Sequence, residues 1–191
     1  MEMSSNLIVP ARRKFLGTAT LSAAAVALLA GQDVLAAGSK SSAADVGILN
    51  VALGLEHEGI NAYQLGAESG LLQKPILDVA VRFQSDHKAH AETLTGAIRK
   101  LGGKPVEAKS MAAYAKALKA DTLKSQNDVL ELARRLELGA TNAYLGVIPS
   151  FHNKAFAKVA ARLAADETMH WALLNNVLGG PLPEGGMPFG A

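Results

Sequence analysis

Two residues with metal-binding side chains stand three positions apart near the end of the chain. Glu167 and His170 belong to the segment DETMH, in a stretch that is otherwise rich in alanine and leucine. Residues at positions i and i+3 share one face of a helix, so a carboxylate oxygen and an imidazole nitrogen there can reach one ion. An ionised carboxylate in an apolar core is costly unless a metal, a cation or a raised pKa compensates for its burial. The spacing therefore predicts a buried metal site.

A similar segment occurs in the first half of the chain, so the sequence repeats itself. DHKAH, residues 86–90, aligns with DETMH, and LEHEGINAYQLG from Leu55 aligns with LELGATNAYLG from Leu136. The aligned polar pairs are Glu56 with Glu137, Tyr63 with Tyr144, Asp86 with Asp166, His87 with Glu167, and His90 with His170. The two halves look like copies of one helical hairpin. Folding of the copies about a pseudo-twofold axis would bring these positions to the centre of one bundle.

Apolar residues that recur every three or four positions predict four long helices that carry these residues. The expected helices are a first one capped by Ser42 or Asp45 and ending near Glu68, a second from Pro75 to Leu101, a third over residues 122–148 and a fourth over residues 152–178. Residues 102–121 connect the two hairpins and are expected to contain a short helix at 111–118. This connection is long for a hairpin loop, so it predicts a crossover between two hairpins.

Composition supports an all-α protein with a single main domain. The chain has 191 residues, 49% of them hydrophobic but only 5% aromatic, a balance that favours helix packing over a sheet. A net charge of +2 without a basic run gives no sign of a nucleic-acid partner. The absence of cysteine excludes disulfides and thiolate metal sites. No phosphate-binding loop, serine-hydrolase motif or calcium loop is present in the sequence.

The first 37 residues have the pattern of an export signal. Arg12 and Arg13 precede Phe15-Leu16 and an uncharged stretch, and cleavage is expected after Ala36 or Ala37. The ARRKFLG segment resembles the twin-arginine signal, which implies the twin-arginine translocation machinery as a partner and a periplasmic or otherwise exported location. The membrane would be a partner only if the signal stays uncleaved as an anchor. We expect residues 38–44 to form a linker, 45–180 the bundle and 181–191 an irregular tail.

The duplicated hairpin and the Glu-x-x-His element resemble the ferritin-like superfamily, and in particular its exported bacterial members. This resemblance implies a ferritin-like four-helix bundle with a site for two metal ions. Carried over by position, the implied ligands are Glu56, His90, Glu137, Glu167 and His170. The sixth ligand position has a glutamate in the family and His87 in this chain.

The replacement of a glutamate by His87 leaves three hypotheses for the metal content. The first is an asymmetric two-metal site with His87 as a terminal ligand. The second is a single ion held by Glu137, Glu167 and His170, and the third is a bundle without metal. Three carboxylates leave about one unit of positive charge uncompensated with two divalent ions. Iron and manganese are the metals expected, although the donor set also suits zinc.

Several polar residues next to these ligand positions have open roles. Asp86 and Asp166 are candidates for a hydrogen bond to the far nitrogen of a ligating histidine, or are surface residues. Tyr63 and Tyr144 are candidates for hydrogen bonds to the buried carboxylates, or are core residues with a polar tip. Glu58 is an alternative to Glu56 as the ligand of the first helix. The residues expected to lie outside the site are His57, His152 and Trp171.

Two functions remain as hypotheses. The first is an exported metal-binding protein with oxidative chemistry, for which the family resemblance implies ferroxidase, peroxide-consuming or oxidase activity. The second is a metal-free or mononuclear bundle with a structural, binding or stress-protective role. A homo-oligomer is a further expectation under a storage function, because a hollow iron-storing shell would require one.

Overall fold

The computed structural model describes residues 39–190, and over this range the chain forms helices and no strand. Four long helices are joined by a shorter one, α4, and by two 3-10 turns, η1 and η2. Their bounds are α2 Ser39–Glu68, α3 Lys74–Lys100, α4 Met111–Ala117, η1 Ala120–Thr122, α5 Gln126–Val147, η2 Ile148–Ser150 and α6 Lys154–Val177. The predicted all-α architecture is confirmed.

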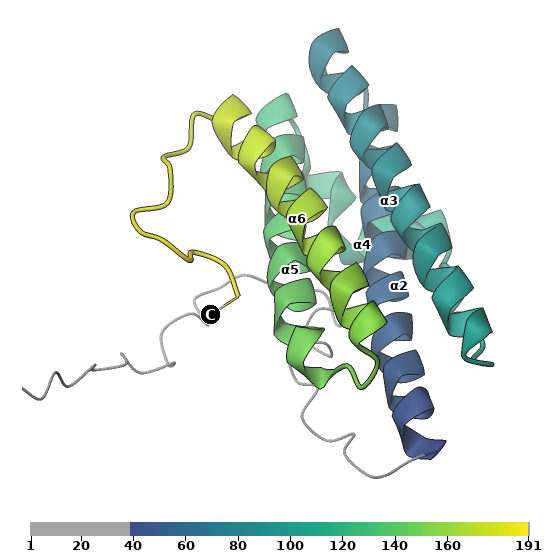
Figure 1. Cartoon of the computed structure of the whole chain (residues 1–191). Helices are drawn as coiled ribbons and strands as arrows, with labels where there is room; N and C mark the ends of the chain where they lie inside the picture. The colour runs from purple at the N-terminus through teal and green to yellow at the C-terminus, as the bar shows by residue number, and fades with distance from the viewer. Residues whose placement is uncertain (1–38, 191) are drawn as a thin grey trace, which may run out of the picture.

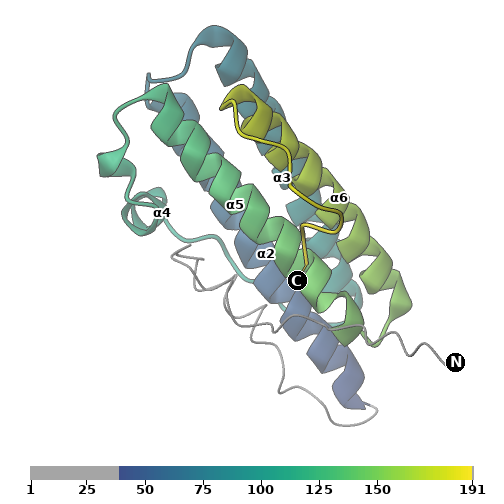
Figure 2. The same cartoon turned by 90° about the vertical axis from the view of Figure 1, so that its left-hand side faces the viewer.

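The long helices form two hairpins that pack side by side as a four-helix bundle (Figure 1). Helix α2 packs along α3, α5 packs along α6, and α2 also lies against α5. The segment that contains α4 crosses between the hairpins, and α4 packs on α2 outside the bundle (Figure 2). The order hairpin, crossover, hairpin is the one that the repeat predicts.

Local signals explain most of the helix ends. Gly70 adopts a left-handed backbone conformation (φ +70°) in the turn after α2, and Pro75 lies in the first turn of α3. The side chains of Ser110, Ser125 and Asn153 accept backbone N–H groups and so cap α4, α5 and α6. The predicted start of the third helix near residue 122 is wrong, because η1 and the Ser125 cap come before α5.

The first helix begins earlier than expected. Helix α2 starts at Ser39, so residues 39–44 are helical and do not form the predicted linker. This stretch contains no glycine or proline, and Ala44 is buried in the bundle. Neither Ser42 nor Asp45 caps α2. The buried carboxylate of Asp45 instead accepts the backbone N–H groups of His152 and Asn153, at 3.0 and 3.1 Å, where α6 begins.

The described core contains three apolar clusters, and polar residues lie between the two larger ones. One cluster includes Leu49, Leu53, Leu94, Ile98, Tyr144, Phe156 and Leu163. A smaller one toward the other end includes Tyr63, Phe83, Leu130 and Leu174. The candidate ligands lie between these clusters along all four helices, so the fold places them in the middle of the bundle.

The C-terminal tail is irregular, as predicted for this segment, and it runs back along α5 and α6 (Figure 2). Asn175 donates a hydrogen bond to the carbonyl of Pro181, and Asn142 accepts one from the backbone N–H of Gly190. The ring of Trp171 packs edge-to-face on Phe189, which agrees with its expected packing role.

Within residues 39–190, no helix is both long enough and apolar enough to cross a membrane. The predicted export signal at residues 1–37, with Arg12 and Arg13, lies outside the described part of the chain.

Candidate metal centre

All six predicted ligand positions lie together in the middle of the bundle, and all are buried. The carboxylates of Glu56, Glu137 and Glu167 have at most 1% of their surface exposed. Within each of two overlapping groups, the ligand atoms lie within 4.8 Å of one another. The first group is Glu56, His87, His90 and Glu167, and the second is His87, Glu137, Glu167 and His170. His87 and Glu167 belong to both groups.

The two tyrosines connect the hairpins through the buried carboxylates. The Tyr63 hydroxyl donates a hydrogen bond to Glu137 Oε1, and the Tyr144 hydroxyl donates one to Glu56 Oε1. Each tyrosine therefore bonds the glutamate of the other hairpin, in the arrangement that a pseudo-twofold axis produces. Of the two roles considered for these tyrosines, the structure supports hydrogen bonding to carboxylates.

The two aspartates lie next to the outer nitrogens of two histidines, again across the hairpins. Asp166 Oδ2 lies 3.3 Å from His90 Nε2, and Asp86 Oδ2 lies 3.5 Å from His170 Nε2. A carboxylate at Nε2 favours the proton on that nitrogen and leaves the Nδ1 lone pair free. In both histidines Nδ1 is the nitrogen that faces the centre, so each ring is oriented as a metal ligand would be.

The atoms that face the centre make close contacts that are not aligned as hydrogen bonds. Glu167 Oε1 lies 3.2 Å from His90 Nδ1, and Glu167 Oε2 lies 3.3 Å from His170 Nδ1. These four atoms and Glu137 Oε2 have no hydrogen-bond partner within the described chain. Buried polar atoms without partners are rare and need an explanation. Convergence of carboxylate oxygens and imidazole nitrogens on a shared space fits a bound metal ion.

His87 differs from the other two histidines because both of its ring nitrogens face carboxylates of the centre. Nδ1 lies 2.7 Å from Glu56 Oε2, and Nε2 lies 3.3 Å from Glu137 Oε1 and 3.8 Å from Glu167 Oε2. The ring therefore lies between the two hairpins and faces both candidate groups.

Gly59 makes room for this ring. A Cβ atom at position 59 would lie 3.0 Å from His87 Cε1 and Nδ1, closer than most real Cβ contacts. Gly59 was not among the predicted site residues. The signal that could have shown it is the repeat, because Gly59 aligns with Ala140 where His87 aligns with Glu167.

The carboxylates of the centre have strongly shifted pKa values. Burial raises the pKa of Glu56, but contacts with His87 and His90 and their charges outweigh burial and lower this pKa to about 2. Burial raises the pKa of Glu167 to about 7. In the metal-free chain, Glu56 is therefore ionised at neutral pH, whereas Glu167 holds its proton part of the time.

The pKa values of the two histidines next to the aspartates are raised, although burial alone would lower them. Burial lowers the pKa of His90, but contacts with Glu167 and Glu56 raise it to about 10. Likewise, burial lowers the pKa of His170, and contacts with Glu137 and Glu167 raise it to about 9. A metal ion must displace these protons, so protons and metal compete for the same nitrogens.

The remaining candidates lie outside both groups. Glu58 is also buried, but of these two glutamates of α2 Glu56 is the one whose carboxylate belongs to a candidate group. The structure therefore favours Glu56 as the ligand of α2. His57 Nε2 contacts the carbonyl of Val106 at 3.2 Å, and His152 lies near Asp45. Thr141, one helical turn after Glu137, is fully buried and its hydroxyl has no hydrogen-bond partner among the described residues. The sequence analysis assigned no role to this hydroxyl.

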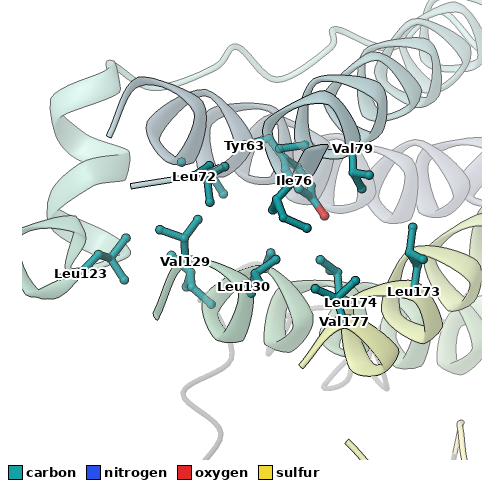
Figure 3. Close-up of a pocket in the computed structure, with 15 residues that line it drawn as sticks. Tyr63, Leu72, Ile76, Val79, Leu123, Val129, Leu130, Leu173, Leu174 and Val177 are labelled. Atoms are coloured by element: carbon teal, nitrogen blue, oxygen red, sulfur yellow. The ribbon is translucent and has the colours of Figure 1, made fainter. Parts of the chain in front are cut away.

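An apolar pocket lies at one end of the bundle, beside Tyr63 (Figure 3). Leu72, Ile76 and Val79 line it from the α2–α3 hairpin, and Leu130 and Leu174 line it from α5 and α6. Its volume is about 30 Å³, enough for only a few atoms. Its lining is almost entirely apolar, so it offers no ligands to a metal ion.

The comparisons with known proteins agree with this architecture. The family model described as "Ferritin-like domain" matches residues 44–180, which include every candidate ligand. The chain belongs to the ferritin-like domain family. The ferritin-like chain is also similar to the crystal structure of a conserved hypothetical protein, rv2844, from Mycobacterium tuberculosis. The TM-score is 0.63 and the identity 21%, over 79% of this chain and 100% of that chain.

This structural similarity supports the fold alone, because the identity is low. No match was found among curated proteins. The comparisons therefore establish the fold, and function must be inferred from the arrangement of the buried side chains.

Proposed function

We propose that this ferritin-like protein is an exported metal-binding protein with a pair of iron or manganese ions and oxidative chemistry. The observation that carries the proposal is the set of inward-facing carboxylate oxygens and imidazole nitrogens without hydrogen-bond partners in the described chain. These atoms belong to two groups of four residues that could each hold an ion, and Glu167 belongs to both groups. Iron and manganese accept mixed oxygen and nitrogen ligands of this kind.

The residues of the chain have separate tasks in this proposal. Glu137, Glu167 and His170 would hold one ion, and Glu56, His90 and Glu167 would hold the other. Asp86 and Asp166 orient the two histidines, and Tyr63 and Tyr144 hold one oxygen of each terminal carboxylate in place. The two apolar clusters on either side keep bulk water away from the carboxylates.

Bound iron or manganese would supply a change of oxidation state toward dioxygen or peroxide. The chain stabilises the higher charge with three buried carboxylates, Glu56, Glu137 and Glu167. Ferroxidase, peroxide-consuming and oxidase activities all require this property. The proposal therefore includes all three activities and does not select one.

Export is part of the proposal through the sequence of residues 1–37. Arg12 and Arg13 would direct the chain to the twin-arginine machinery, which transports proteins that are already folded. A metal inserted before export would then be retained in the periplasm. Fusion of residues 1–40 to a reporter should give export that is lost when both arginines are replaced by lysine.

Activity is tested with metal-loaded protein and the Glu137→Gln variant. The wild type should oxidise Fe(II) or consume peroxide well above the variant, because Glu137 is a ligand. Glu92→Gln is a matched control, since Glu92 is an exposed glutamate on α3 and should leave the activity unchanged. Equal rates for the wild type and Glu137→Gln would contradict the oxidative role.

A second candidate function is a structural or stress-protective bundle without metal. The observation that favours it is His87, whose ring lies between Glu56 and Glu137. Burial lowers the pKa of His87, but the charges of Glu137 and Glu167 outweigh burial and raise it well above its usual value. A protonated His87 would compensate the carboxylates without an ion. A melting temperature that chelator leaves unchanged would support this alternative, because a bound metal stabilises the fold by mass action.

A further inference from the structure

The duplication of the hairpin provides an internal comparison for the two halves of the centre. Glutamate, tyrosine, histidine and aspartate occupy equivalent positions in both hairpins and make equivalent contacts. Two neighbouring positions break this symmetry. The first hairpin has Gly59 and His87 where the second has Ala140 and Glu167. The two halves of the centre therefore differ at one ligand and at the residue that makes room for it.

The difference changes which carboxylate oxygens are engaged. Glu56 Oε1 accepts a hydrogen bond from the Tyr144 hydroxyl. Glu56 Oε2 lies 2.7 Å from His87 Nδ1. Glu137 accepts a hydrogen bond from the Tyr63 hydroxyl at Oε1, where His87 Nε2 also lies at 3.3 Å. Its Oε2 has no hydrogen-bond partner among the described residues and lies 3.5 Å from His170 Nδ1. Both oxygens of Glu56 are thus engaged, whereas Glu137 offers one oxygen to an ion.

His87 can serve only one of the two halves as a neutral ligand. A ligating imidazole uses one nitrogen lone pair and keeps its proton on the other nitrogen, where a carboxylate usually accepts it. Nδ1 makes the shorter contact, 2.7 Å to Glu56 Oε2, whereas Nε2 lies 3.3 Å from Glu137 Oε1. Nε2 is therefore the nitrogen that faces the group containing Glu137, Glu167 and His170.

We propose that the two halves of the centre bind metal unequally and in a fixed order. Glu137 Oε2, Glu167 Oε2, His170 Nδ1 and His87 Nε2 form a complete four-donor set for a first, tight ion. The half with Glu56 and His90 takes a second ion more weakly, because Glu56 Oε2 already lies 2.7 Å from His87 Nδ1 and its Oε1 accepts the Tyr144 hydroxyl. This inference rests on the proposed function and specifies the roles of Gly59, His87 and Glu56 within it.

The order of binding can be measured with Mn²⁺ on chelator-stripped full-length protein. Bound metal is counted by plasma mass spectrometry after equilibrium dialysis, and the spin coupling of bound Mn²⁺ is read by electron paramagnetic resonance. We expect a first equivalent with the signal of an isolated ion, and a second equivalent with at least about tenfold lower affinity, since one hydrogen bond to Glu56 competes with it. Two equivalents of equal affinity would overturn the inference and leave the proposed function intact. A folded protein that binds neither Mn²⁺ nor Fe²⁺ would overturn both.

A matched pair of variants tests which half binds first. Glu137→Gln should remove the tight equivalent, whereas Glu56→Gln should keep it and lose only the weak one. Because Glu56 and Glu137 are equally buried and occupy equivalent positions, a symmetric centre would respond equally to both changes. An equal loss of affinity in the two variants would contradict the inference.

The role of Gly59 as a positioning residue is tested by exchanging the residues that break the symmetry. Gly59→Ala should push the His87 ring away and weaken the tight equivalent about tenfold, whereas Ala140→Gly is the matched control and should leave it unchanged. The double variant Gly59→Ala with His87→Glu copies the second hairpin and should give two equivalents of similar affinity with coupled spins. A general folding defect from Gly59→Ala would not be rescued in this way. Unequal sites in the double variant would count against the assignment.

Discussion

At the scale of single residues, the centre depends on polar atoms that are oriented by a second polar group. Asp86 and Asp166 contact the outer nitrogens of His170 and His90, and so turn the inner nitrogens toward the carboxylates. From the sequence, each aspartate could be either a partner of a ligating histidine or a surface residue. Its position one residue before the motif does not show which histidine it would reach. The structure shows that each one reaches the histidine of the other hairpin.

Removal of one aspartate should weaken metal binding without unfolding the protein. Asp166→Asn takes away the charge that orients His90, and loss of such a partner typically lowers metal affinity by about 10- to 100-fold. Competition with a fluorescent chelator would measure this change. Asp78→Asn is the control, since Asp78 pairs with Lys74 on the exposed surface of α3, the helix that also carries His90. Equal metal affinities for both variants would show that Asp166 has no orienting role.

The shifted pKa values predict that the metal-free protein becomes less stable as the pH rises. The pKa values of Glu167, His170 and His90 are raised to about 7, 9 and 10, so the folded state holds protons that the unfolded chain releases. Their contribution to stability is lost from pH 4.5 to 7 for Glu167, and from pH 6.5 to about 10 for the histidines. The pKa of Glu56 is lowered to about 2, so its contribution is lost as the pH falls below 4.5.

Thermal unfolding with chelator should therefore give the highest melting temperature near pH 4.5 and lower values at neutral and alkaline pH. With saturating Mn²⁺ the trend above neutral pH should weaken or reverse, because metal binding improves as protons leave the histidines. Parallel pH profiles with and without metal would contradict the assignment of these residues as ligands.

At the scale of helices, a buried carboxylate on one hairpin fixes the start of a helix on the other. Asp45 in α2 accepts two backbone N–H groups before α6, and so holds the first and last helices together at one end of the bundle. The helix periods, the turns and the six inward positions could be predicted from the sequence, because they follow from local spacing and from the repeat. The partner of Asp45 could not be predicted, since it lies more than a hundred residues away in the chain. The fit of the His87 ring against Gly59 was not predicted either, because it depends on side-chain packing between α2 and α3, although the repeat marks both positions.

Asp45→Ala should destabilise the bundle by about 1–3 kcal/mol, since two backbone N–H groups lose a buried acceptor. Urea unfolding of metal-free protein would measure the free energy of unfolding. Ser110→Ala removes the cap of the short, outer helix α4 and should cost about 1 kcal/mol or less. A smaller effect for Asp45→Ala than for Ser110→Ala would show that this contact does not hold α2 and α6 together.

At the scale of the whole molecule, the duplicated hairpins pack their two ends unequally. Phe156 fills one end of the bundle and contacts Phe151, whereas the aligned residue at the other end is Ile76, which lines the apolar pocket. The candidate metal centre lies between a well-filled end and a less filled one. The two hairpins are therefore alike in fold, but the two ends of the bundle are packed differently.

Ile76→Phe should fill part of the pocket and raise the melting temperature by a few degrees, about 1 kcal/mol of added burial. Calorimetry would measure the shift, and the metal content should stay the same, because the pocket offers no ligands. A lower melting temperature would show that the end of the bundle has no room for the larger ring.

Elemental analysis would show whether the buried glutamates and histidines bind metal. Protein exported by its own signal and purified without chelator should contain about one to two equivalents of iron or manganese. Glu167→Ala should contain almost none, because Glu167 belongs to both groups. Metal-free wild-type protein whose melting temperature does not rise with added metal would contradict the account.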